Sequence, residues 1–190
     1  MEAFFISTLA ITLGEIGDKT QLLALMLALR FKRSTPIILG ILCATLANHL
    51  LAAWFGQWLA QHISATTLKY ILSASFLAIA AWTLIPDKLE NAALEKNDYG
   101  VFLLTCLTFF LAEMGDKTQL ATVALAAKYQ ALFLVLAGTT LGMLIADIPA
   151  VILGKLAAPN FPFKLVRMIA AAIFAALGVA VLLVELAPHP

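Results

Sequence analysis

The chain has 190 residues, of which 63% are hydrophobic and 12% charged, and its formal net charge is +1. Soluble domains contain roughly 45 to 50% apolar and about 25% charged residues, so this composition excludes an ordinary soluble protein, a large extramembrane domain and a nucleic-acid-binding face. The two cysteines, Cys43 and Cys106, both lie in apolar runs, which is typical of small buried hydrophobes and argues against a disulfide framework.

Six long apolar runs predict six membrane-spanning helices, because each reaches or approaches the roughly 20 residues that a bilayer requires. The N-terminus lacks the basic region of a cleavable signal, so we expect the first run to be retained. The runs cover Phe4–Leu29, Pro36–Ala60, Leu68–Ile85, Val101–Ala127, Leu132–Leu153 and Phe163–Leu186. The expected fold class is therefore an all-α polytopic membrane protein.

A polar stretch divides the chain into two halves of three predicted spans each. Residues 1–86 form the first half, residues 87–99 the linker and residues 100–190 the second half. Lysine and arginine favour the cytoplasmic side of a membrane. The basic residues at the connections and adjoining span ends are Arg30, Lys32, Arg33, Lys88, Lys96, Lys155, Lys164 and Arg167 on one side, against Lys69 and Lys128 on the other. We therefore expect a cytoplasmic linker and both termini facing away from the cytoplasm.

The two halves are copies of one unit. An offset of 98 residues places Glu15–Leu22 over Glu113–Leu120 with a single mismatch, and the same offset pairs Gly40 with Gly138. Because each unit has an odd number of spans, the second copy enters the membrane in the opposite orientation. Inverted repeats of this kind recur in secondary transporters, whose substrate site lies near the bilayer midplane. The alternative is that duplication is only an economical way to build a helix bundle.

Apart from Glu185 at the end of the last span, five acidic residues lie inside the predicted spans: Glu15, Asp18, Glu113, Asp116 and Asp147. A charge at the centre of a membrane helix costs on the order of 2.5 to 3.5 kcal/mol on insertion scales, so such residues usually face a bundle interior or a water-filled path. The first four form two pairs with a spacing of three, which places each pair on one helix face. We expect these four carboxylates to converge where the halves meet.

This set of side chains favours a hard divalent cation. Carboxylate oxygens suit Ca²⁺, Mn²⁺ or Mg²⁺, and further oxygen donors follow the acids: Thr20, Gln21, Thr118 and Gln119. No histidine or cysteine occurs at equivalent positions of both halves, which argues against a site for Zn²⁺ or Cu⁺. The ion would be cargo, and no cofactor is expected.

Lys19 and Lys117 each follow a motif glutamate by four residues, so each can pair with that glutamate along one helix face. The four acids and two lysines then carry a total charge of −2, which one divalent cation would neutralise. On the alternative interpretation these pairs are packing contacts only. That interpretation leaves Asp18 and Asp116 without partners.

Two questions about the spans stay open. Gly17 and Gly115, inside the motifs, either break the helix, as in discontinuous transporter helices, or allow close packing. Asp147 and His49 occupy equivalent positions of the two halves, and together with Asn48 they could line a proton path. The alternatives are a hydrogen-bonded core histidine, and an aspartate with a local partner near the following proline.

Two copies of Glu-x-Gly-Asp-Lys-Thr in a chain of this length resemble the Gdt-type divalent cation transporter family, whose bacterial members include MneA-like manganese exporters. The resemblance covers essentially the whole chain. It implies a compact bacterial form in the cytoplasmic (inner) membrane, Mn²⁺ as the transported ion with Ca²⁺ as a second substrate, and movement out of the cytoplasm. The family's motif positions are Glu15, Gly17, Asp18, Lys19, Thr20, Glu113, Gly115, Asp116, Lys117 and Thr118. Gln21 and Gln119 come from ligand chemistry alone.

The mechanism we expect is alternating access around one central site. Proton antiport is one way to drive release, because buried carboxylates exchange metal for protons, and sodium coupling or uncoupled passage fits the same residues. A Ca²⁺/H⁺ antiporter is the nearest alternative. A membrane-embedded enzyme acting on lipid phosphates needs basic clamps, but all three arginines flank spans, so we expect no enzyme. Beyond the ion and membrane lipid, self-association through glycine-bearing faces is left open.

Overall fold

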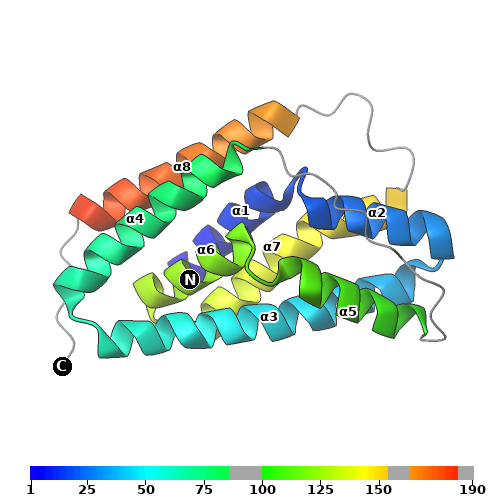
Figure 1. Ribbon diagram of the computed structural model, residues 1–190, viewed down its shortest axis with the longest axis horizontal. Coiled ribbons are helices and arrows are strands. Elements are labelled where there is room, and N and C mark those ends of the chain that lie inside the picture. The colour runs from blue at the N-terminus through cyan, green and yellow to red at the C-terminus, as the bar shows by residue number, and fades with distance from the viewer. Residues whose placement is uncertain (86–99, 154–162, 184–190) are drawn as a thin grey trace.

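The computed structural model describes residues 1–85, 100–153 and 163–183, and within those ranges its regular structure is entirely α-helical. This confirms the expectation of an all-helical chain. In chain order the helices are α1 (Glu2–Glu15), α2 (Lys19–Phe31), α3 (Ser34–His62), α4 (Ala65–Thr83), α5 (Val101–Glu113), α6 (Lys117–Tyr129), α7 (Leu132–Leu153) and α8 (Phe163–Leu183) (Figure 1). The expected linker 87–99 lies outside the described residues.

Among the described residues, four helices are individually long and apolar enough to cross a membrane, namely α3, α4, α7 and α8. The other two predicted spans, Phe4–Leu29 and Val101–Ala127, each consist of two shorter helices, α1 with α2 and α5 with α6. The question left open at the motif glycines is thus decided, because both motif spans are broken there. An integral membrane protein follows from the four long helices.

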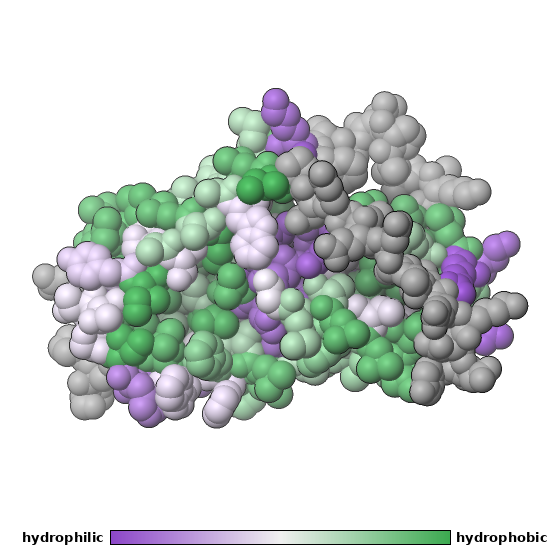
Figure 2. All heavy atoms as spheres, in the orientation of Figure 1, coloured by the Kyte–Doolittle hydropathy of each residue, from purple (hydrophilic) through white to green (hydrophobic). Residues whose placement is uncertain are grey.

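The outer surface of the bundle is apolar. Exposed fractions reach 81% for Phe133, 67% for Leu111 and 60% for Trp54. Figure 2 shows hydrophobic residues over most of one face, with hydrophilic residues near its middle and toward its ends. A surface of this kind suits lipid as its solvent, because large contiguous apolar patches are rare on soluble monomers.

The two halves of the chain interlock through glycine contacts. Helix α5 of the second half packs on α3 of the first, and a Cβ at Gly40 would lie 2.9 Å from the carbonyl oxygen of Phe102. Helix α1 of the first half packs on α7 of the second, and a Cβ at Gly138 would lie 2.5 Å from the carbonyl oxygen of Phe4. These two contacts are related by the same offset of 98 residues. The absence of a side chain therefore lets the helices approach closely at equivalent places.

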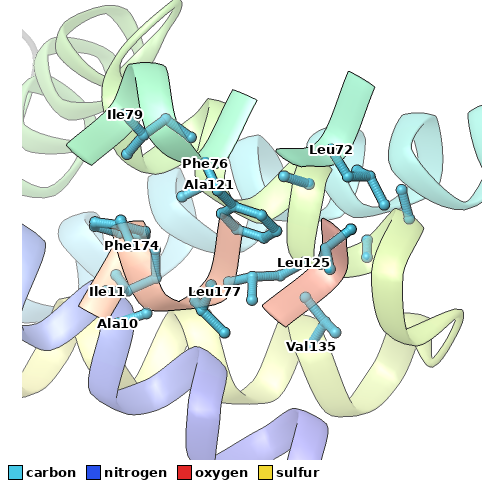
Figure 3. Close-up of a cluster of buried hydrophobic side chains, with 14 of the residues drawn as sticks. Ala10, Ile11, Leu72, Phe76, Ile79, Ala121, Leu125, Val135, Phe174 and Leu177 are labelled. Carbon is cyan, nitrogen blue, oxygen red and sulfur yellow. The ribbon is translucent and has the colours of Figure 1, made fainter. Parts of the chain in front are cut away.

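The larger hydrophobic core fills the space between α1, α3, α4, α6, α7 and α8 (Figure 3). Phe76 of α4 and Phe174 of α8, which are repeat equivalents, are both fully buried in it. Helices α4 and α8 run side by side along one edge of the bundle (Figure 1). Helices α4 and α8 thus close the bundle on the same side of the motif helices.

The two cysteines give a direct test of the contact between α3 and α5. The thiols of Cys43 and Cys106 are free but adjacent, one from each half of the chain. We expect copper-phenanthroline oxidation to join them in a disulfide, because adjacent thiols on packed helices need little movement to reach bonding geometry. After cleavage at a protease site inserted between residues 87 and 99, the oxidised protein should migrate as one species without reductant and as two halves with it.

Cys106→Ser is the matched control, and it should migrate as two halves under both conditions. Separation of the oxidised wild-type halves without reductant would contradict the α3–α5 contact.

Candidate functional site

The first motif forms a tight turn between α1 and α2. Ile16 (φ −62°, ψ 117°) and Gly17 (φ +82°) have the backbone angles of a type II turn. The N–H of Asp18 closes the turn by donating to the carbonyl oxygen of Glu15 at 2.9 Å. The third turn position of this type requires a positive φ, which glycine adopts without steric cost. The glycine therefore breaks the helix, and the carboxylates on either side of it belong to different helices.

The second motif repeats this turn between α5 and α6. Met114 (φ −61°, ψ 120°) and Gly115 (φ +75°) occupy the central positions, and the N–H of Asp116 donates to the carbonyl oxygen of Glu113 at 3.1 Å. Each turn presents the C-terminus of one short helix and the N-terminus of another. Such broken helices supply both carbonyl oxygens and positive dipole ends to transporter sites.

The two glutamines fix the turns. The side-chain oxygen of Gln21 accepts the N–H of Gly17 at 2.9 Å, and that of Gln119 accepts the N–H of Gly115 at 2.7 Å. Gln21 also donates its amide to the carbonyl oxygen of Ala146 in α7 at 2.9 Å. Their predicted role was to offer free amide oxygens to the ion. In this structure those oxygens are engaged with the backbone.

The two glutamates are held by the motif threonines. Thr20 donates to Oε2 of Glu15 at 2.6 Å, and Thr118 donates to Oε2 of Glu113 at 3.2 Å. Both glutamates are fully buried, and among the described residues the Oε1 atom of each has no hydrogen-bond partner. Thr118 also interacts with Glu15, and the two carboxylates repel each other electrostatically. The glutamates of the two halves are thus neighbours, each with one oxygen available to a cation.

The motif lysines pair with the aspartates of the opposite half. Nζ of Lys117 lies 2.7 Å from Oδ1 of Asp18, and Nζ of Lys19 lies 3.1 Å from Oδ2 of Asp116. The expected pairing of each lysine with the glutamate four residues before it is therefore wrong. The spacing rule behind that expectation assumes one continuous helix, and the turn separates the glutamate from the lysine.

The two ion pairs differ in their exposure. The Lys117 side chain is 3% exposed and the Lys19 side chain 33% exposed, although both partner aspartates are buried. The chemically identical motifs thus occupy unequal environments. One lysine is enclosed in the bundle, and the other reaches its surface.

The structure brings the motif acids together without a formed metal site. Glu113 interacts electrostatically with Glu15, Asp116 and Asp18, so the four carboxylates share one region. In the part of the chain that the structure describes, however, no three Asp, Glu, His or Cys side chains are arranged to hold one metal ion. The four-carboxylate site stays a prediction. In this conformation two of its members are engaged by lysines.

The three secondary candidates lie on α3 and α7. Asp147 of α7 is fully buried and interacts electrostatically with Glu15 and Glu113. His49 of α3 is also fully buried, and neither of its ring nitrogens has a hydrogen-bond partner among the described residues. Asn48 donates to the carbonyl oxygen of Phe110 at 2.9 Å. Asp147 therefore lies near the glutamates, whereas Asn48 serves a contact between α3 and α5.

Comparison with known proteins gives a consistent result. A family described as "Divalent cation/proton antiporter GDT1" matches residues 3–91 and 101–188. A protein of Vibrio cholerae named "Putative manganese exporter" is 48% identical over 181 residues, covering 95% of this chain and 90% of the relative. A GDT1-like protein of Synechocystis is 30% identical over 195 residues, covering 92% and 93% of the two chains. No solved structure matches.

Proposed function

The chain belongs to the GDT1 family of divalent cation/proton antiporters, and we propose that it exports Mn²⁺ from the cytoplasm, with Ca²⁺ as a second substrate. Family membership makes the protein a cation transporter and not an enzyme. The Vibrio relative is named for manganese export, and hard oxygen donors suit Mn²⁺. A Ca²⁺/H⁺ antiporter is the second candidate, because Ca²⁺ is also bound by carboxylate oxygens.

The proposal rests on how the motif charges pair: the lysines pair with the aspartates, and the glutamates accept hydrogen bonds from the threonines. Lys117 and Lys19 neutralise the aspartates across the two halves, at 2.7 and 3.1 Å. The two glutamates then carry the remaining charge of −2, and each has one buried oxygen without a partner. Unpaired buried charge is costly. One divalent cation between the two glutamates would offset this cost.

The architecture we propose is six spans arranged as two inverted repeats, residues 1–86 and 100–190, joined by a cytoplasmic linker. The paired short helices α1–α2 and α5–α6 each make one crossing, and the glycine contacts related by 98 residues support the repeat. The protein lies in the bacterial inner membrane with both termini away from the cytoplasm, because basic residues gather at the opposite ends of the spans.

Transport proceeds by alternating access around the broken helices. Cytoplasmic Mn²⁺ enters between α1–α2 and α5–α6 and exchanges part of its water for the Oε1 atoms of Glu15 and Glu113. Thr20 and Thr118 hold the opposite oxygens and thereby orient both carboxylates. All four motif carboxylates belong to the midplane site: the two glutamates contact the ion, and Asp18 and Asp116 lie beside them with the lysines as their counter-charges. Movement of the halves then opens the site to the other side.

Proton antiport fits the same residues. When the ion leaves, buried carboxylates retain an uncompensated negative charge unless protons replace it. The family description names a proton as the exchanged ion. Asp147, His49 and Asn48 are candidates for the proton path.

The proposal is tested by metal uptake into proteoliposomes. Wild-type protein should move Mn²⁺ faster than Ca²⁺ and Mg²⁺, and an opposing pH gradient should accelerate the flux. Glu15→Gln and Glu113→Gln should reduce Mn²⁺ flux to the level of empty liposomes, because each removes one of the two unneutralised charges. The control is Glu2→Gln, which removes an exposed carboxylate at the N-terminus and should leave the flux unchanged.

Unaltered Mn²⁺ flux in both motif variants would refute the site. Ca²⁺ flux above Mn²⁺ flux would favour the second candidate. The direction of transport in the cell is tested by the manganese sensitivity of a deletion strain, which should exceed that of the parent.

A further inference from the structure

Asp147 lies outside both motifs, but hydrogen bonds hold its helix, α7, beside the first motif turn. Helix α7 packs along α1 and α2. Gln21, which closes the first motif turn, donates to the carbonyl oxygen of Ala146 at 2.9 Å. One turn earlier, Thr12 donates to the carbonyl oxygen of Gly142 at 3.3 Å. These two hydrogen bonds fix the position of α7 along α1 and α2. Residue 147 therefore lies beside the turn that follows Glu15.

The Asp147 carboxyl group is fully buried, and neither of its oxygens has a hydrogen-bond partner among the described residues. The local partner considered near Pro149 is absent from that part of the chain. An ionised carboxylate in this position is expensive. A protonated one would be unsatisfied as well, because its O–H would have no acceptor. Neither protonation state of Asp147 would therefore stabilise the fold.

Three buried carboxylates therefore share one neighbourhood. Asp147 interacts electrostatically with both Glu15 and Glu113, which also interact with each other. Each of the three has at least one buried oxygen without a partner in the described chain. The nearby lysines are both engaged with aspartates at 2.7 and 3.1 Å. A bound cation would supply the missing partner of all three carboxylates.

We propose that Asp147 is a third carboxylate in contact with the ion, supplied by α7 and binding the transported divalent cation together with Glu15 and Glu113. This inference rests on the proposed function and extends its site beyond the motifs. In the absence of an ion the three like charges repel, in keeping with the lack of a formed three-residue metal site among the described residues. Ion binding draws them together.

With Asp147 as a ligand, the two halves contribute different numbers of carboxylates to the site. The repeat equivalent of Asp147 is His49, which offers no carboxylate. The ion therefore has an anionic ligand from the second span of one half only. A third negative charge favours divalent over monovalent cations, since each carboxylate interacts with the full charge of the ion. Asp147 is thus expected to determine specificity as well as affinity.

The test compares Asp147→Asn with Thr140→Val in Mn²⁺ uptake and in thermal unfolding with and without Mn²⁺. Thr140 lies two turns earlier on the same face of α7, and its buried hydroxyl also has no partner among the described residues. We expect Asp147→Asn to raise the half-saturating Mn²⁺ concentration by about tenfold or more, as the loss of a metal-site group commonly does. Its ion-free unfolding temperature should not fall, because the substitution removes a buried charge. Thr140→Val should keep the wild-type half-saturation.

The outcomes separate this inference from the proposed function. Wild-type protein without Mn²⁺ uptake overturns the proposed function, whereas a transporting wild type with an unchanged Asp147→Asn variant overturns only the role of Asp147. A lower ion-free unfolding temperature with wild-type half-saturation also overturns it, since that result marks a structural residue. If Asp147→Asn does not fold, Asp147→Glu decides. A changed preference between Mn²⁺ and the larger Ca²⁺ supports the inference, and wild-type preference and affinity overturn it.

Discussion

Replacing Lys117 with methionine should destabilise the protein by about 3 kcal/mol, the range for breaking a buried ion pair by removing one partner. Its Nζ atom lies 2.7 Å from Oδ1 of Asp18, and the side chains are 3% and 0% exposed. Methionine keeps an unbranched side chain of similar length but removes the charge that neutralises Asp18. For a chain of this size we expect an unfolding temperature roughly 10 °C lower in detergent.

The same substitution at Lys19 should have a smaller effect. That side chain is 33% exposed and its ion pair is longer, at 3.1 Å. Ion pairs near solvent contribute about 1 kcal/mol or less. The two lysine-to-methionine variants, at repeat-equivalent positions, should therefore lose different amounts of stability. Thermal unfolding of both in the same detergent measures the difference. Equal losses would contradict the difference in enclosure between the two pairs.

A double variant separates charge from packing. Combining Lys117→Met with Asp18→Asn removes both charges of the pair, so most of the lost stability should return. Mn²⁺ uptake should not return, because Asp18 remains a predicted member of the site. If the double variant is no more stable than Lys117→Met alone, the loss comes from packing and not from the unpaired aspartate.

Gly56→Ala should destabilise the bundle by about 3 kcal/mol, at the upper end of the range for overpacking. A Cβ at Gly56 of α3 would overlap the carbonyl oxygen of Val123 in α6 and lie 3.1 Å from Cβ of Ala126. A backbone atom cannot rotate away as a side chain can, so the two helices must separate. The unfolding temperature in detergent should fall by roughly 10 °C.

Gly100→Ala is the matched control. A Cβ at this position, just before α5, meets nothing within 4 Å. The variant should unfold at the wild-type temperature. A fall as large as that of Gly56→Ala would show that lost chain flexibility, and not the contact between α3 and α6, governs the response to added methyl groups.

The sequence predicts the helical class well, because apolar length is a strong signal. Intramembrane charge singles out the motif residues in a chain with few charged residues. It also identifies Gly17 and Gly115 as candidate breaks. Whether these glycines break the helix or only allow close packing depends on their backbone angles. A glycine permits a positive φ but does not require it. Only the structure, with φ of +82° and +75°, shows the turns.

The partners of Lys19 and Lys117 could not be predicted by helical spacing. Residues four apart meet only when the helix between them is continuous, and the type II turn changes the direction of the chain. The bonds from Thr20 to Glu15 and from Thr118 to Glu113 join residues five apart across the same turn. A signal was present, since each of these residue types recurs at an offset of 98, but recurrence does not specify which groups touch.

The two motif turns have nearly the same backbone, with ψ of 117° and 120° before glycines at φ of +82° and +75°. Their lysines nevertheless differ from 33% to 3% in exposure. The local fold of the motif is therefore insensitive to its surroundings. An exchange of environments between the two copies requires helices to shift as rigid bodies, and no peptide unit inside either turn has to rotate.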